Sequence, residues 1–223
     1  MKKYLLLPLM LAISACVPAS HPGVVTRAAM EPASTSSLPA MKRFTVHQSL
    51  PAPRSNNDLS LDFIELSFRM ESGKELPVFT RFEGPVTVRV IGAPPPTLGP
   101  DLTALLNRLR QEARIDISPT SGPNANITVE AVSRRTINKV LPQAACFVAP
   151  NVSSLDEYKK VRRTAQTNWS LLKTRSRVSI FIPNDASPQE VRDCLHEELA
   201  QALGPLNDLY RLPDSVFNDD NVH

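Results

Sequence analysis

DCLHEELAQALGPLND, residues 193–208, decides the fold of this chain, because it forms most of a long helix and the turn that ends it. Ser187 is a good helix cap, Pro188 suits the first helical position, and Glu190 completes a capping box. Gly204 stands where helices commonly end in a left-handed residue, and Pro205 cannot continue the helix. The sequence therefore predicts a helix over residues 188–203.

One face of this predicted helix combines apolar and acidic residues. Its apolar stripe consists of Val191, Cys194, Leu195, Leu199 and Ala202. Glu198 falls inside the stripe, and a core-facing carboxylate is costly unless it is paired, hydrogen-bonded or bound to a metal. Gln201 lies one turn from Glu197, and the turn at Gly204 brings Asn207 and Asp208 beneath the helix. We expect oxygen-bearing side chains of Glu197, Gln201, and Asn207 or Asp208 to converge there.

The same residues resemble the metzincin motif of zinc peptidases, H-E-x-x-H-x-x-G-x-x-H-D. Glu198, Gly204 and Asp208 keep their spacing, whereas the three histidine positions hold Glu197, Gln201 and Asn207. The resemblance implies that Glu198 is the catalytic general base and that Glu197, Gln201, Asn207 and Asp208 are the degenerate metal ligands. A second frame starts at His196, but Ala200 then occupies the position of the second histidine.

The replaced ligands change the chemistry that we expect. Zn²⁺ prefers histidine nitrogen and cysteine sulfur, whereas oxygen donors suit a harder divalent ion such as Ca²⁺ or Mg²⁺. Whether a divalent metal is the cofactor stays open, and peptide hydrolysis at zinc-peptidase rates is not expected. Three interpretations of the site remain: a closed hydrogen-bond network, a metal-bound or catalytic site, and a binding cleft on an inactive frame.

A second resemblance covers most of the chain from about residue 57. FIELSFRMESG (63–73), APNVSS (149–154) and HEELAQALGPLNDLYRLPDSVFND (196–219) resemble an uncharacterised family of bacterial lipoproteins, a domain of unknown function. This resemblance implies no established activity.

The N-terminus predicts the compartment. Lys2 and Lys3 precede an apolar stretch, residues 4–13, that is too short to span a membrane. Ile13-Ser-Ala-Cys16 resembles the lipobox of bacterial lipoproteins, which implies cleavage after residue 15 and lipidation of Cys16. Val17, which is not Asp, matches the default for the outer membrane, so we expect a lipid-anchored protein facing the periplasm. The alternative is an ordinary signal peptide with a chance cysteine.

Cys146 and Cys194 then remain as the only pair of thiols in an oxidising compartment. We expect a disulfide between them, and two buried free thiols are the alternative. Metal binding is not expected of either cysteine, because neither lies in a CxxC spacing.

The rest of the chain divides into a tether and one domain. Residues 16–56 are rich in Pro, Ser and Ala and predict a tether. Residues 57–223 predict a single α+β domain with a mixed sheet and packed helices, similar in order to zincins. In zincins more chain follows the third ligand, so either the domain is truncated or the sequence is a fragment. The expected helices are 58–72, 101–114, 156–163 and 188–203, and the expected strands are 76–81, 85–92, 115–117, 125–132 and 177–182.

Charge says little about partners. Loss of Lys2 and Lys3 with the signal lowers the net charge from +3 to +1, and no basic block or motif predicts nucleic-acid binding. We expect contact with the membrane through the lipid, and a protein or peptide partner is open. Two functions remain: a metallopeptidase-like hydrolase of the envelope whose activity is unproven or lost, and a non-enzymatic binding or scaffold lipoprotein.

Overall fold

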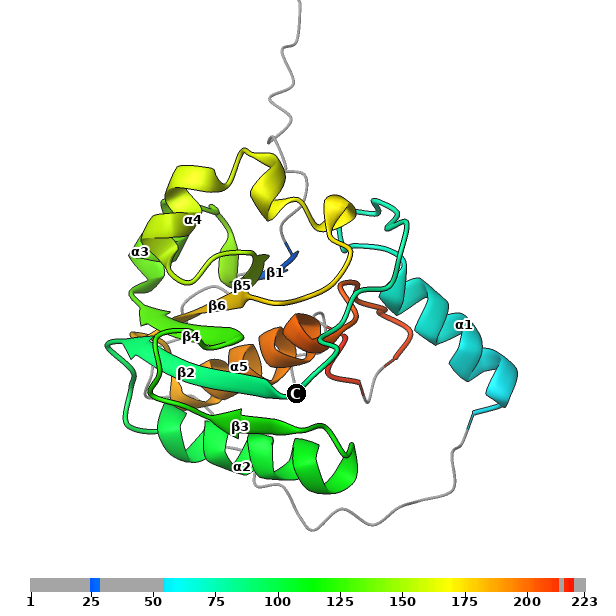
Figure 1. The fold of residues 1–223 in the computed structure, drawn as a ribbon, viewed down its shortest axis with the longest axis horizontal. Helices are drawn as coiled ribbons and strands as arrows, with labels where there is room; N and C mark the ends of the chain where they lie inside the picture. Colours follow the sequence, from blue (N-terminus) through cyan, green and yellow to red (C-terminus); the bar gives the residue numbers. More distant parts are fainter. Residues whose placement is uncertain (1–24, 29–53, 213–214, 219–223) are drawn as a thin grey trace, which may run out of the picture.

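A computed structural model describes residues 25–28, 54–212 and 215–218, which include one six-stranded mixed sheet (Figure 1). Strand β5 runs antiparallel to its neighbours β1 and β6, whereas β6, β4, β2 and β3 pair in parallel. The order across the sheet is β1 (Val25–Ala28), β5 (Ala144–Pro150), β6 (Val178–Pro183), β4 (Ile127–Val132), β2 (Val86–Gly92) and β3 (Ile117–Pro119).

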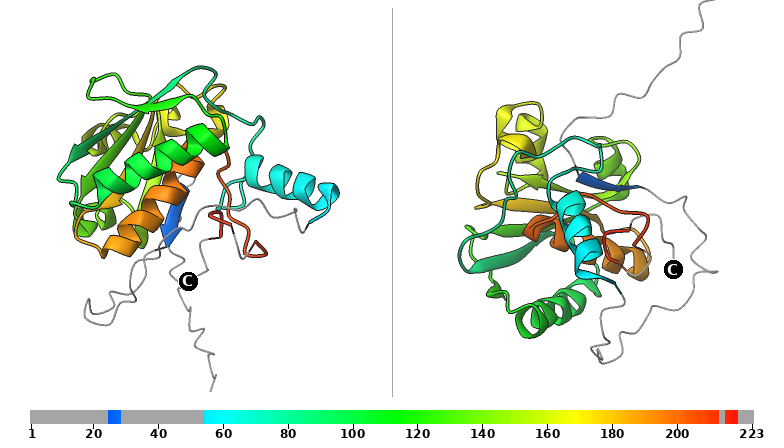
Figure 2. Two further views of the ribbon diagram at one scale, coloured as in Figure 1. Left: turned by 90° about the horizontal axis from the view of Figure 1, so that it is seen from below. Right: turned by 90° about the vertical axis from the view of Figure 1, so that its right-hand side faces the viewer.

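Helices cover both faces of the sheet, so the α+β fold with a mixed sheet is confirmed. Helices α2 (Leu98–Glu112) and α5 (Pro188–Leu203) lie side by side on one face (Figure 2). The shorter helices α3 (Arg134–Asn138) and α4 (Leu155–Val161) lie on the other face, and α1 (Asn56–Ser67) stands beyond the end of the sheet. None of the helices in the described part of the chain is long and apolar enough to cross a membrane.

The central strands are buried on both faces, which explains the one strand of the domain that the sequence did not reveal. Strand β5, AACFVAP, is buried at every position and has no polar alternation. On the side of α4, Phe147 packs against Tyr158 with ring centroids 5.2 Å apart. Its neighbour Cys146 points the other way, toward α5. A strand covered on both faces reads as a continuous apolar run, not as an alternating one.

The predicted strand at residues 76–81 is wrong. Strand β2, the next strand in the chain, has both of its edges occupied, by β3 on one side and β4 on the other. Residues 76–81 therefore run outside the sheet as irregular chain. A short strand also lies within the predicted tether, because Val25–Ala28 pairs with β5 at the edge of the sheet.

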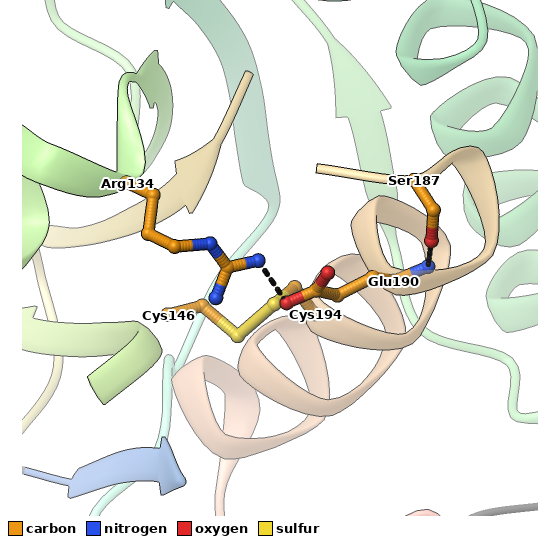
Figure 3. The surroundings of a disulfide bond; sticks show 5 residues. All are labelled: Arg134, Cys146, Ser187, Glu190 and Cys194. Atoms are coloured by element: carbon orange, nitrogen blue, oxygen red, sulfur yellow. Dashed lines mark hydrogen bonds and ion pairs between the residues drawn. A yellow bond between two sulfur atoms is a disulfide. The ribbon is translucent and has the colours of Figure 1, made fainter. Parts of the chain in front are cut away.

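Helix α5 begins and ends where the sequence predicted. Ser187 Oγ accepts a hydrogen bond of 3.2 Å from the Glu190 backbone, and the Glu190 carboxylate pairs with Arg134 (Figure 3). Gly204 ends the helix, but its φ is −166°, so the expected left-handed conformation is wrong. A side chain at this position would lie 3.2 Å from the ring of Phe79, so glycine allows that ring to pack against the helix end.

Helix α1 overlaps the predicted helix 58–72, but its apolar residues do not mark its buried face. Leu61 and Ile64 are 50% and 52% exposed, whereas Asp62 is buried and pairs with Arg211 at 2.8 Å. The helix packs on the chain that follows α5, where Leu66 forms a small cluster with Leu209, Leu212 and Phe217. Its Phe63 ring also meets Phe79, with ring centroids 5.5 Å apart. The chain that follows α5 therefore holds α1.

The expected disulfide joins the sheet to the long helix. Cys146 on β5 and Cys194 on α5 form it, and both residues are fully buried (Figure 3). It closes a loop between residues 48 positions apart in the sequence. A cross-link over such a loop lowers the entropy of the unfolded chain, which is worth about 4 kcal/mol.

We predict that the double variant Cys146→Ala, Cys194→Ala has a free energy of unfolding about 3–4 kcal/mol lower than the wild type, measured by urea denaturation. Because both sulfurs are buried, reductant should open the bond in the wild type only under unfolding conditions. Reduction of the native protein as fast as that of the unfolded chain would contradict the buried position.

Candidate functional site

The candidate site is built on the face of α5 that carries its acidic residues. Glu197, Glu198 and Gln201 are 4%, 0% and 0% exposed. Glu197 and Glu198 are neighbours in the chain, and Gln201 lies one helical turn further on. One turn of α5 therefore buries two carboxylic groups and an amide. Groups of this kind need partners inside a protein.

Three carboxylic groups from distant parts of the chain meet beside this turn. One oxygen each of Glu71, Glu197 and Asp208 lies within 4.8 Å of the other two. Backbone contacts position Glu71, which follows α1. Its N–H donates to the oxygen of Leu206 at 3.2 Å, and Met70 forms a parallel bridge with the same residue. We call Glu71, Glu197 and Asp208 the carboxylate cluster.

Gln201 reaches the carboxylate cluster through its amide. Its Nε2 donates a hydrogen bond of 2.9 Å to Glu71 Oε1. Its Oε1 is buried and accepts no hydrogen bond within the described part of the chain. Of the predicted ligand residues, Glu197, Gln201 and Asp208 are therefore brought together.

Asn207, the fourth predicted ligand, is placed differently. Its Nδ2 donates to the backbone oxygen of Glu65 in α1, at 3.1 Å. The residue thus ties the end of the turn to α1, and Glu71 supplies the additional carboxylate of the cluster. Sequence reasoning missed Glu71, because it lies in no motif and only the fold brings it to α5.

Glu198, the predicted general base, is sealed from solvent in this structure, with an exposed fraction of 0%. A general base has to lie within hydrogen-bonding reach of the water or substrate proton that it removes. In this conformation Glu198 belongs to the packed interior of the helix face, so catalysis by Glu198 would require the site to open.

Arg175 holds the C-terminal end of α5 next to the cluster. Its guanidinium donates to the backbone oxygens of Gln201, Ala202 and Gly204, the second of these at 2.6 Å. Its Nε donates to Thr80 Oγ1 at 3.1 Å. Burial lowers the pKa of Arg175 to about 9, so the guanidinium stays charged at neutral pH. A cation here also suits the negative end of the helix dipole.

His196, the start of the alternative frame, lies beside α2. Burial lowers the pKa of its imidazole, and the nearby charges of Arg108 and Arg192 lower it further. The ring is therefore neutral at pH 7. Arg192 also pairs with Asp101 of α2 at 2.6 Å, which fixes this side of α5 against its neighbour. Asp101 lies inside the first turn of α2, which begins at Leu98, so the helix starts three residues before the predicted residue 101.

The model of one protein family, DUF2927, described as a protein of unknown function, matches residues 56–223. The chain belongs to the DUF2927 family. The matched part of the chain begins with α1 and includes Arg175, Gln201 and the carboxylate cluster. Comparison with curated proteins found no match. The DUF2927 description assigns no activity, and the geometry of this site is what indicates a function.

We predict that Arg175→Ala lowers the free energy of unfolding of this DUF2927 domain by about 3–5 kcal/mol, because buried carbonyls lose a charged donor. Arg175→Lys should recover only part of the loss, since an ammonium cannot reproduce the planar fork. Lys173→Ala, an exposed change two residues away, is the matched control and should alter stability by less than about 0.5 kcal/mol. Equal effects of Arg175→Ala and Lys173→Ala in urea denaturation would contradict this role.

Proposed function

We propose that the chain is a lipid-anchored protein of the bacterial cell envelope, attached through Cys16 and facing the periplasm. Its metallopeptidase-like domain serves as a non-hydrolytic binding or scaffold module. The lipobox-like sequence Ile13-Ser-Ala-Cys16 supports the anchor, and the buried disulfide fits an oxidising compartment.

The non-hydrolytic proposal rests on the burial of Glu198 and on the hydrogen bonds made by the residues at the ligand positions. Glu198 has no solvent-exposed surface, and the amides of Gln201 and Asn207 donate to Glu71 and Glu65. An active zinc peptidase needs nitrogen-rich ligands, an open coordination position and a base that touches water. The carboxylate and amide oxygens at the ligand positions supply no nitrogen ligand, and the buried Glu198 does not touch water.

The zincin-like part of the proposal rests on the order of elements and on spacing. Strand β6 leads directly into the capped helix α5, and the glycine turn at residue 204 follows. Glu198, Gly204 and Asp208 stand at the motif positions. We infer that the frame of a peptidase has been retained while its ligands were replaced.

A metallopeptidase-like hydrolase is the second candidate, favoured by one observation. The carboxylate cluster includes Glu197, the neighbour of Glu198 in the chain, and could hold the metal ion that such a hydrolase needs. In that case Glu198 would be the general base, and a conformational change would have to expose it.

We predict no peptide hydrolysis above background by the full chain, assayed on unfolded casein and a fluorogenic peptide library with added Zn²⁺ or Ca²⁺. The Glu198→Gln variant should give the same result. Metal-dependent cleavage by the wild type that is lost in a folded Glu198→Gln protein would establish the hydrolase instead.

We predict that the chain fractionates with membranes and that Cys16→Ser releases it, because acylation requires the thiol of Cys16. Mass spectrometry of the mature N-terminus should show an acylated residue 16. Ser20→Ala, just outside the lipobox-like sequence, is the control and should stay with the membranes. An unmodified Cys16 in the mature wild type would contradict the anchor.

A further inference from the structure

We propose that the carboxylate cluster and Gln201 together bind one Ca²⁺ ion. The ligands are one oxygen each of Glu71, Glu197 and Asp208, and Oε1 of Gln201. This assignment goes beyond the proposed function, since it names the ion, adds Glu71 and leaves Asn207 out. It stands whether or not Glu198 is catalytic.

The spacing of the oxygens fits calcium. Ca²⁺ binds oxygen at about 2.3–2.6 Å, so two ligands of one ion lie at most about 4.6–5.2 Å apart. The oxygens of Glu71, Glu197 and Asp208 are all within 4.8 Å of one another. One Ca²⁺ therefore fits among them without a change of backbone, and bidentate carboxylates and water would complete six to eight ligands.

Gln201 is an independent sign of a ligand. It is fully buried, and its Oε1 accepts no hydrogen bond from the described residues. A buried amide oxygen left in this state costs free energy. The same amide touches the cluster through Nε2, which lies 2.9 Å from Glu71 Oε1. A turn of the amide that exchanges Nε2 and Oε1 would bring Oε1 to a cation among the carboxylates, and amide oxygens are common calcium ligands.

The charge of the site also favours a cation. Three carboxylates held this close repel one another when they are ionised, and a bound cation lowers that repulsion. Arg175, the buried guanidinium beside Gln201, directs its hydrogen bonds to backbone oxygens and to Thr80. Glu71 and Asp208 are only partly buried, so an ion can reach the cluster from solvent.

The bound ion would connect three segments of the chain. Glu71 follows α1, Glu197 lies in the middle of α5, and Asp208 lies in the segment that holds α1. Each segment supplies one acidic ligand, so removal of the ion should loosen the attachment of α1 to the rest of the domain.

Calcium binding to the full chain in detergent, stripped with a chelator, tests this inference by isothermal titration calorimetry and thermal unfolding. We expect one Ca²⁺ per chain with a dissociation constant of about 10⁻⁵–10⁻³ M, and tighter binding than Mg²⁺. Glu71→Gln and Asp208→Asn should each weaken binding at least ~10-fold. Glu75→Gln removes an exposed carboxylate four residues from Glu71 that pairs with Arg69, and it should change the affinity less than ~2-fold.

The unfolding temperature gives a second test, because Glu71→Gln should compare differently with the wild type in the absence and in the presence of Ca²⁺. Without Ca²⁺, Glu71→Gln should unfold at the same temperature as the wild type or higher, because it relieves repulsion in the cluster. With Ca²⁺, only the wild type and Glu75→Gln should gain stability. No heat and no thermal shift at about 10 mM Ca²⁺, or an equal shift in Glu71→Gln, would overturn the site. Tighter binding of Mg²⁺ would overturn the choice of ion. Peptide cleavage would contradict the proposed non-hydrolytic function but not the calcium site.

Discussion

The structure depends on one constraint, the burial of polar groups of α5 beside the apolar stripe that packs against the sheet. Val191, Cys194, Leu195 and Leu199 attach the helix to β5 and β6, and the disulfide fixes this contact covalently. Beside these apolar residues, Glu197, Glu198 and Gln201 are nearly or fully buried. Such groups are tolerated only where other polar atoms or ions surround them.

The segments around α5 supply polar groups that contact the buried polar atoms of this helix. Arg175 satisfies the last carbonyl groups of the helix, which have no intrahelical donors. The segment after α1 brings Glu71 to the amide of Gln201. The turn after Gly204 returns Asp208 to the same place. Helix α1 is attached to the domain because the segment that carries Glu71 and the turn that carries Asp208 both contact α5.

Residues near the ends of α5 were sufficient to predict this helix. The strand β5, residues 76–81 and the buried face of α1 depend on contacts with distant parts of the chain, which the sequence does not show. A serine cap, Pro188 and Gly204 fix both ends of the helix, so residues 188–203 were predicted as they occur. The buried strand β5 has no alternation to reveal it, and residues 76–81 alternate although both edges of β2 are taken. The spacing of Leu61 and Ile64 predicts a helix but not the neighbour that decides its buried face.

The same difference applies to the site. Glu197 and Gln201 were identified because helical spacing places them one turn apart, and Asp208 because of the glycine turn. Glu71 was missed, since its approach to Gln201 depends on a contact 130 positions apart in the sequence. Asn207 looked equivalent to Asp208, but the position of α1 decides that its amide contacts Glu65.

The central claim is that the oxygen atoms of Glu71, Glu197, Gln201 and Asp208 form a site that selects a hard ion over Zn²⁺. The most direct measurement is equilibrium dialysis of the full chain against equal concentrations of Ca²⁺ and Zn²⁺, followed by elemental analysis. The account predicts close to one calcium per chain, lost in Glu197→Gln, with no stoichiometric zinc. Stoichiometric zinc that displaces calcium, or no bound ion of either kind, would contradict it.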